Sequence, residues 1–228
     1  MTRTCAFVFA RGGSKALPRK NVLTIGGLPL LVHGIRTAQQ LKSISAIYVS
    51  TDCDEIAAIA GNAGAEVIKR PPELASDDSP EWLSWQHAIN HVNTHFQPFE
   101  VFLSLPATAP LRNAEDVLNC INALKKDVDF VVTISSANRS PWFNMVTKDD
   151  KGVVGLVCNE SSIHRRQDAP KCFDMTTVAY VARTDFILRA KSIWDGNVVG
   201  IEIPAERALD IDTPLDFAIA KILMEHKL

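Results

Sequence analysis

The strongest constraint on the fold is a regular alternation of short strand-like runs with longer segments of helical periodicity. The strand-like runs are residues 4–10, 46–51, 66–69, 101–105 and 130–135, and the helical segments are residues 29–41, 52–63, 79–95, 113–126 and 214–226. Strands that alternate with helices are joined by right-handed crossovers, which build a mostly parallel sheet. Helices then cover both faces of that sheet. We therefore predict a three-layer α/β fold.

Residues at the ends of the helical segments support this division. Asp52 precedes the second helical segment and is expected to cap it, and Gly64 is expected to end it. Asn113 is expected to cap the fourth helix. Thr213 stands three residues before Asp216, which is the spacing of a reciprocal cap at a helix start.

The alternation breaks between residues 136 and 174, where no long helical period occurs and short apolar runs resemble hairpins. We predict that this segment, 136–174, is a small β-rich arm suited to dimerisation. Strands at 177–183 and 198–203 then complete the sheet. With 228 residues, of which 46% are hydrophobic, the chain can form one domain with such an appendage.

Composition excludes several classes of protein. The formal net charge of −2 argues against a general nucleic-acid binder, and no apolar run reaches membrane-spanning length. The five cysteines are scattered without C-x-x-C spacing, so neither a disulfide framework nor a structural zinc site is indicated. The apolar run before Arg11 is too short for a secretory signal. We expect a cytoplasmic protein that engages neither membrane nor nucleic acid.

A basic, glycine-containing loop follows the first predicted strand at residues 9–21, FARGGSKALPRKN. Its cations and small residues are Arg11, Gly12, Gly13, Ser14, Lys15, Arg19 and Lys20. The glycines let a ligand approach the backbone, whose free N–H groups then bind anions. Clustered cations repel one another unless a polyanion is present, so we predict a di- or triphosphate site. A solvated basic turn is the alternative, and both common phosphate-loop patterns are absent.

Two aspartates near the C-terminus form a second candidate site, in the stretch LDIDTPLDF. If residues 209–212 are extended, Asp210 and Asp212 share one face because side chains alternate along a strand. Two neighbouring carboxylates repel, and a divalent cation removes that repulsion. Two oxygen ligands plus substrate phosphates are a common way to hold Mg²⁺. Turn or capping roles for both aspartates remain the alternative.

These two features together favour nucleotidyl transfer. The basic loop, residues 51–52 and the turn at 106–112 all follow strands, and ligands of parallel sheets bind at the carboxyl ends of strands. There the cations can hold the β- and γ-phosphates as they leave as pyrophosphate, while a metal neutralises the α-phosphate. No protein nucleophile is needed, so catalysis is mostly positioning and electrostatics.

Several other residues admit two interpretations. Arg165 and Arg166, beside Gln167, suit a carboxylate or phosphate of a second substrate, or they form a solvated face. His87, His91 and His95 recur every fourth residue on one helix, where a metal site competes with a simple helix exterior. The tryptophans Trp82 and Trp85 fit core or interface positions better than base stacking.

Six motifs, in order, resemble those of the acylneuraminate cytidylyltransferases, the CMP-sialic acid synthetases and their relatives. They are ARGGSKALPRKN, VSTD, RPPELASD, ATAPLR, RRQDAP and DIDTPLDF. The resemblance implies a Rossmann-like α/β domain, a homodimer whose arm reaches the partner's site, Mg²⁺, and transfer of CMP from CTP to a 2-keto-3-deoxy acid sugar with release of pyrophosphate.

The resemblance also implies roles for individual residues. Arg11, Lys15 and Lys20 correspond to phosphate contacts, and Asn21 and Arg70 help to hold the nucleotide. A separate group corresponds to metal and sugar contacts: Asp210 and Asp212 bind the metal, while Arg165, Arg166, Gln167 and Tyr180 face the second substrate.

Two departures concern the sugar end of this site. Where the family has L-Q-P-T-S-P-L-R, this chain has LPATAPLR, so Pro106 replaces a glutamine that addresses the sugar. Thr176 replaces an asparagine in the block that ends at Tyr180. Because a lost amide changes the hydrogen bonds that select a sugar, we expect an N-acylneuraminate or a related nonulosonate, such as legionaminate or pseudaminate. A Kdo-like octulosonate, another sugar nucleotide, and an inactive nucleotide-binding regulatory domain are the alternatives.

Overall fold

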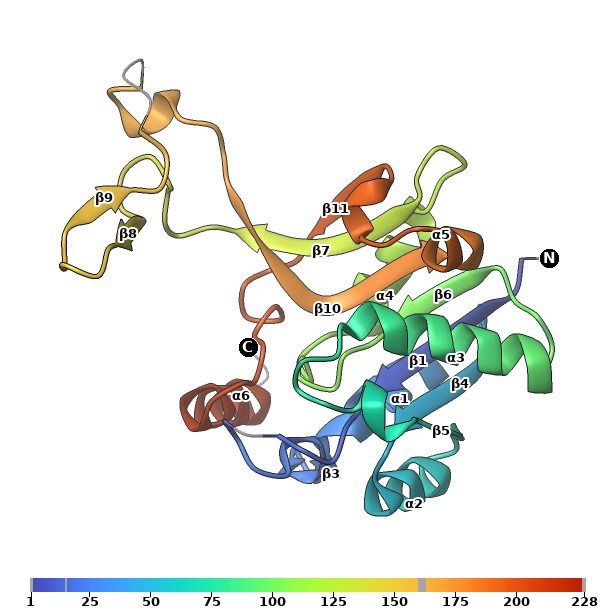
Figure 1. The fold of residues 1–228 in the computed structure, drawn as a ribbon. Helices are drawn as coiled ribbons and strands as arrows, with labels where there is room; N and C mark the ends of the chain where they lie inside the picture. The colour runs from blue at the N-terminus through green and yellow to red at the C-terminus, as the bar shows by residue number, and fades with distance from the viewer. Residues whose placement is uncertain (1, 15, 160–162, 227–228) are drawn as a thin grey trace.

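The central element is a seven-stranded sheet in the order β11-β7-β10-β6-β1-β4-β5. A computed structural model describes residues 2–14, 16–159 and 163–226 (Figure 1). The strands are β1 (Thr4–Phe9), β4 (Ile44–Thr51), β5 (Glu66–Lys69), β6 (Val101–Ser104), β7 (Phe130–Ser136), β10 (Phe173–Arg183) and β11 (Val198–Glu202). All neighbours pair in parallel except at β10, which is antiparallel to both β6 and β7. The predicted mostly parallel α/β sheet is confirmed.

Helices cover both faces of the sheet, as the alternating pattern predicts. One face carries α1 (Leu30–Gln39), α2 (Asp54–Asn62) and α4 (Ala114–Ala123), and the other carries α3 (Glu81–His95) and α5 (Thr184–Arg189). In β1, Ala6 and Val8 join the first core, whereas Cys5 and Phe7 join the second. All four side chains are fully buried. Because successive strand residues face opposite sides, one strand supports two apolar cores.

The helix-end predictions are partly confirmed. Gly64 ends α2 with a φ of +87°, a conformation that glycine adopts without strain. Asn113 begins α4 with a reciprocal cap. The prediction for Asp52 is wrong, because Cys53 occupies the cap position of α2 without a side-chain bond. The Asp52 carboxylate instead accepts a hydrogen bond from the Gly12 N–H at 2.9 Å.

Residues 137–172 leave the sheet between β7 and β10 as an arm. The arm contains the antiparallel hairpin of β8 (Val146–Lys148) and β9 (Val154–Leu156), and a 3₁₀ turn, η3 (Arg166–Asp168). Figure 1 shows the hairpin standing away from the body of the molecule at the ends of β7 and β10. The chain leaves on β7 and returns on β10 without a crossover helix, which explains why these two strands are antiparallel. The β-rich character of the predicted arm is confirmed.

The C-terminal helix α6 (Pro214–His226) packs beside the small hairpin of β2 (Thr24–Ile25) and β3 (Leu28–Pro29). Ile25, Leu30, Ile211 and Ala220 are buried together at this contact. This packing brings the start of α6 next to the loop that follows β1. Within the described ranges, no helix has both the length and the apolar character that a membrane crossing needs.

Candidate active site

An open cavity of about 300 Å³ lies where the loop after β1 meets the loop before α3. Five residues predicted to contact a nucleotide line it: Arg11, Ser14, Lys20, Asn21 and Arg70. Thr108, from the turn after β6, lines it too. The structure therefore gathers segments from three strand ends into one basic pocket. Lys15, which belongs to the same prediction, lies outside the described residues.

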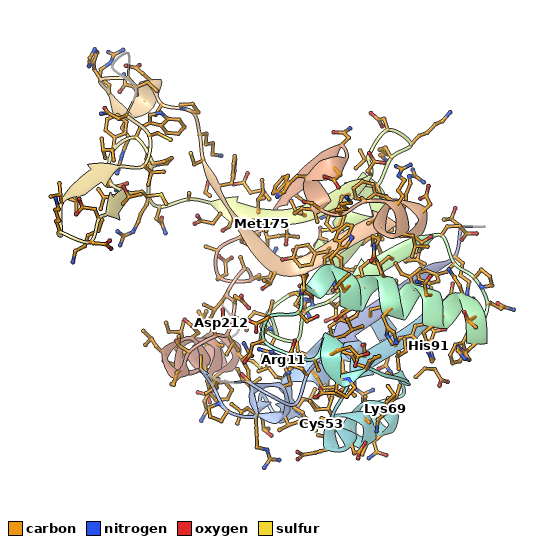
Figure 2. The ribbon with its side chains drawn as sticks, in the orientation of Figure 1. Arg11, Cys53, Lys69, His91, Met175 and Asp212 are labelled. Atoms are coloured by element: carbon orange, nitrogen blue, oxygen red, sulfur yellow. The ribbon has the colours of Figure 1, made fainter. Side chains whose placement is uncertain are left out.

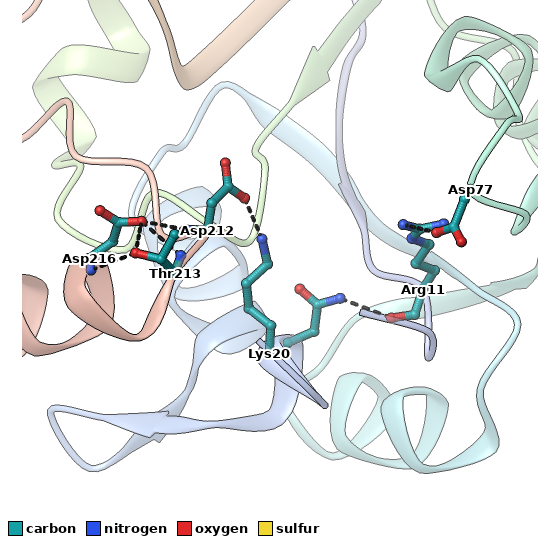
Figure 3. A network of polar contacts seen from close by, with 7 residues as sticks. Arg11, Lys20, Asp77, Asp212, Thr213 and Asp216 are labelled. Atoms are coloured by element: carbon teal, nitrogen blue, oxygen red, sulfur yellow. Dashed lines mark hydrogen bonds and ion pairs between the residues drawn. The ribbon is translucent and has the colours of Figure 1, made fainter. Parts of the chain in front are cut away.

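The two best-placed cations of the basic loop form ion pairs with carboxylates on different sides of the pocket. Arg11 Nη2 lies 2.6 Å from Asp77 Oδ1, and Lys20 Nζ lies 2.7 Å from Asp212 Oδ1 (Figure 3). Arg11 reaches across to the loop before α3, whereas Lys20 reaches the segment before α6. Lys20 thus joins the predicted phosphate loop to the predicted metal-binding segment, 192 residues apart in sequence.

The backbone of the basic loop is held by short polar contacts. Asn21 is buried, and its Nδ2 donates a hydrogen bond to the Arg11 carbonyl oxygen at 3.0 Å. A Cβ atom on Gly12 would lie 3.0 Å from Cys53 Cβ, so a larger residue here would press on Cys53 and force a small shift. The Gly12 N–H is taken by Asp52, and the expectation that this amide faces a ligand is therefore corrected.

Arg70 is a fixed cation in the pocket wall. Its Nε donates to Ser50 Oγ at 3.1 Å, its Nη2 donates to the Ser50 carbonyl at 2.8 Å, and its guanidinium lies 5.5 Å from the centre of the Phe9 ring. Burial lowers the pKa of Arg70, while nearby Asp52 opposes that shift. The side chain stays charged because an arginine pKa starts far above neutrality.

The segment that carries the two aspartates is anchored by its apolar residues. Residues 209–212 form no strand, yet Ile211 is fully buried and its N–H donates to the Thr108 carbonyl at 2.8 Å. Asp212 faces Lys20. Asp210 Oδ1 is buried and has no hydrogen-bond partner in the described part of the chain. The two carboxylates therefore flank one buried anchor in the sequence, with Asp210 half-buried and Asp212 exposed, and their sharing one face stays a prediction.

A buried arginine lies beneath this segment. Arg112 Nε donates to the Val178 carbonyl at 2.7 Å, and its Nη2 donates to the Pro106 carbonyl. Burial lowers the pKa of Arg112 to about 9, while Asp210 and Asp116 oppose the shift. Arg112 therefore remains protonated at neutral pH and places a buried positive charge beneath this segment.

The two departures from the family pattern, Pro106 and Thr176, have structural roles here, since the Pro106 carbonyl accepts a hydrogen bond from Arg112. Thr176 is buried and its hydroxyl donates to Thr133 Oγ1 at 2.8 Å, across β10 and β7. Tyr180 is also buried, and its pKa is raised to about 12 by burial and by the charges of Glu81 and Asp210. Tyr180 therefore lies near the carboxylates, on the side where the resemblance implies a sugar.

The arm residues lie apart from the basic pocket. Arg165 forms a two-pronged contact with Asp168, at 2.8 and 3.0 Å. Arg166 and Gln167 line a second cavity of about 300 Å³, together with Lys171. None of the three predicted arm residues lines the basic pocket of the same chain. A shared site would need a second copy of the chain.

Several residues of the pocket were not predicted as site residues, among them Asp77, Glu81 and Thr108. Glu81 lines the cavity, although its sequence position indicated only the start of α3. An acidic residue in a first helical turn is normal, because it complements the helix dipole. No further sequence signal could have distinguished it.

The remaining candidates behave as structural residues. Trp85 is buried and lies within stacking or tilted contact of Phe102, Phe130 and Tyr180, so its predicted core position is confirmed. His91 and His95 stack at 4.4 Å. In the part of the chain that the structure describes, no group of three or more histidine, cysteine or acidic side chains is arranged to hold a metal.

Comparison with known proteins decides the family. The sequence model of the family described as "Cytidylyltransferase" matches residues 5–190. The chain belongs to the cytidylyltransferase family. Its predicted membership is thereby confirmed, and with it the assignment as a nucleotidyltransferase. A CMP-N,N'-diacetyllegionaminic acid synthase of Campylobacter jejuni is 34% identical, over 100% of this chain and 97% of the relative.

Two further similarities agree with this family. A Campylobacter coli protein named post-translational flagellin modification protein B is 32% identical, over 100% of this chain and 97% of the relative. The solved structure of a CMP:2-keto-3-deoxy-manno-octonic acid synthetase complexed with CTP superposes with a TM-score of 0.75, at 16% identity, and covers 100% of both chains. At that identity the structural match supports the fold.

Proposed function

We propose that this cytidylyltransferase transfers CMP from CTP to the anomeric hydroxyl of a 2-keto-3-deoxy acid sugar, an N-acylneuraminate or related nonulosonate, with release of pyrophosphate. One observation supports the reaction most strongly: the Lys20–Asp212 pair joins the basic pocket to the carboxylate segment. The legionaminate activity in the name of the Campylobacter jejuni relative supports the acid-sugar acceptor.

In this proposal, different residues of the pocket hold the phosphates and the nucleoside of CTP. Arg11 and Lys20, with Lys15, hold the β- and γ-phosphates, and Arg70 with Asn21 supports the nucleoside end. In the structure Arg11 is paired with Asp77, so binding of CTP exchanges that carboxylate for a phosphate. Both contacts are charge-assisted, so Arg11 has an anionic partner before and after the exchange.

The aspartate segment fits a divalent cation. Asp210 has a buried carboxylate oxygen without a partner among the described residues, and Asp212 offers a second carboxylate beside it in sequence. Carboxylate oxygens are the ligands that Mg²⁺ prefers. When bound there, Mg²⁺ would neutralise charge on the α-phosphate. Its loss would leave Asp210 and Asp212 repelling the nucleotide.

The residues of the chain then act by position and charge. The sugar hydroxyl oxygen forms a bond to the α-phosphorus and its proton passes to solvent water, while the bond from that phosphorus to the bridging oxygen of pyrophosphate breaks. Arg11 and Lys20 stabilise the negative charge that develops on the departing pyrophosphate. Their fixed placement supplies the orientation of the reacting groups.

The arm supports a homodimer in this proposal. Its exposed apolar side chains include Val146, Val153 and Val154, which are 55%, 64% and 59% exposed. A second copy would cover them and bring Arg165, Arg166 and Gln167 to the acid sugar in the partner's pocket. We place the reaction in the cytoplasm, because all five cysteines are unpaired and a reducing compartment keeps them so.

The experiment is pyrophosphate release from CTP and Mg²⁺ with a panel of 2-keto-3-deoxy acids, including N-acetylneuraminate, N,N'-diacetyllegionaminate, pseudaminate and Kdo. Turnover with a nonulosonate is expected, and competition among the four nucleoside triphosphates should select CTP. No turnover with any acid, in a folded protein that binds CTP, contradicts the proposal. CTP binding that is unchanged by Asp210→Ala with Mg²⁺ present would instead favour a regulatory domain.

A further inference from the structure

The basic pocket contains a carboxylate that has no ion pair among the described residues. Glu81 lines the same cavity as Arg11 and Lys20. Those two cations are paired with Asp77 and Asp212, whereas Glu81, which is also exposed, forms no ion pair in the described ranges. A carboxylate surrounded by cations normally pairs with one of them. The local structure explains why Glu81 does not.

Arg70 is the cation whose charge stabilises the ionised form of Glu81, but its guanidinium already makes other contacts. Its guanidinium donates two hydrogen bonds to Ser50 and lies over the Phe9 ring. The Trp85 indole N–H lies close enough to favour the ionised form of Glu81, but it falls short of full hydrogen-bond geometry. The carboxylate oxygens of Glu81 therefore remain open to a ligand in the cavity.

The Glu81 carboxylate needs a new partner once a ligand fills the cavity. Glu81 is exposed, so water solvates it in the free protein, although partial desolvation by the concave wall raises its pKa and Asp210 adds to that shift. A ligand that displaces this water must supply a hydrogen-bond donor or an opposite charge in its place. The phosphates of CTP and the carboxylate of an acid sugar offer acceptors only. The donors available are therefore N–H and O–H groups, and the separate KM values for CTP and sugar show which substrate carries them.

We propose that Glu81 is a specificity-determining residue that accepts a hydrogen bond from an N–H or O–H group of the acid sugar. The inference depends on the proposed function for the identity of that ligand. Glu81 begins α3 one helical turn before Trp85, whose ring lies 5.6 Å from the Tyr180 ring, so Glu81 lies near the expected sugar side of the site. Amide N–H groups of acylamino sugars and the hydroxyls shared by all these acids are the candidate donors.

The test uses the full chain with Glu81→Gln and Glu81→Ala. For the preferred sugar, the alanine variant should raise the sugar KM about 10- to 100-fold, the usual effect of losing a hydrogen bond to a charged group. The glutamine variant retains one acceptor oxygen and should lose less. The KM for CTP should change by less than about twofold in both. Comparing sugars with and without acylamino groups then shows whether the donor is an amide or a hydroxyl.

Glu73→Gln is the matched control, because it removes one negative charge from the preceding loop at an exposed residue outside the cavity. It should leave both KM values unchanged. Calorimetry of each sugar with wild type and Glu81→Gln gives a readout that needs no turnover. Thermal melts confirm that each variant is folded.

Three outcomes overturn the inference while leaving the proposed function intact: an unchanged sugar KM, an effect on the CTP KM alone, and a large fall in kcat at constant sugar KM with loss of the acidic limb of the pH profile. The last result would make Glu81 the proton acceptor instead. Weaker sugar binding in Glu81→Gln without any pyrophosphate release would support the inference and contradict the proposed function. No binding of any sugar to wild type contradicts both.

Discussion

Replacing Lys20 with methionine separates the structural from the catalytic role of the Lys20–Asp212 pair. The side chains are 13% and 66% exposed, so water screens the pair from the Asp212 side. Such a pair contributes at most about 1 kcal/mol to the free energy of unfolding. Methionine also keeps the apolar stem. Losing a donor to charge that develops in the transition state, by contrast, costs about 3–4 kcal/mol, or about 10²- to 10³-fold in kcat.

The assay for Lys20→Met combines pyrophosphate release with urea unfolding of the same preparation. We expect kcat/KM to fall about 10²- to 10³-fold while the free energy of unfolding changes by less than about 1 kcal/mol. Arg19→Met is the matched control, because it removes the same charge one residue earlier. Arg19 pairs with Glu55 instead, does not line the basic pocket, and has a side chain that is 67% exposed.

Two results would refute the reasoning about Lys20. If Arg19→Met lost as much activity as Lys20→Met, general positive charge rather than a placed cation would explain the effect. If Lys20→Met lost about 3 kcal/mol of unfolding free energy, the activity loss would reflect an unstable protein.

Three further predictions test other parts of the structure. Asp116 is 3% exposed and accepts two hydrogen bonds from Arg207 at 2.9 Å, so Asp116→Ala should lower the urea unfolding free energy by about 3 kcal/mol, and an unchanged midpoint would contradict the buried pair. Burial and the neighbouring histidines lower the pKa of His91 from 6.5; the folded state resists protonation, so stability should fall as pH drops below 6.5, and His91→Gln should flatten that fall in thermal melts. Chelation should abolish pyrophosphate release and Mg²⁺ should restore it, whereas Asp210→Asn should lose activity that added Mg²⁺ does not rescue.

Features encoded by local sequence could be predicted. The alternation of apolar runs gave the sheet and its two helical layers, and the start of α6 forms as expected, since Asp216 Oδ2 accepts from both the Thr213 N–H at 2.7 Å and the Thr213 hydroxyl at 2.8 Å. These contacts span three residues, so side-chain chemistry and spacing determine them. The basic loop was recognisable for the same reason, because its cations and glycines are contiguous.

Contacts between distant segments could not be predicted residue by residue. Asp52 stands where a helix cap is expected, but its carboxylate accepts a hydrogen bond from the Gly12 N–H, which lies 40 residues away in the sequence. Glu81 begins α3 as its sequence indicates, and only the fold shows that it lines the cavity without an ion pair among the described residues. For Asp52 a tertiary contact overrides a local preference, whereas for Glu81 the tertiary arrangement adds a position in the pocket.

The sugar end of the site was the least predictable part. Pro106 and Thr176 mark it as different from the family pattern, but a substitution indicates only which hydrogen bond is absent. The structure shows which hydrogen bonds these two residues make instead: the Pro106 carbonyl accepts one from buried Arg112, and the Thr176 hydroxyl donates one to Thr133. Both residues therefore make hydrogen bonds within the protein. We expect Glu81 and Tyr180 to contact the sugar in their place.

The transfer of CMP to the acid sugar is tested by ³¹P NMR of the complete reaction with CTP, Mg²⁺ and the preferred acid sugar. We expect the CTP resonances to disappear as those of pyrophosphate and one phosphodiester appear, with CMP joined to the anomeric oxygen. Formation of CDP with inorganic phosphate, or of CMP without a sugar phosphodiester, would contradict it.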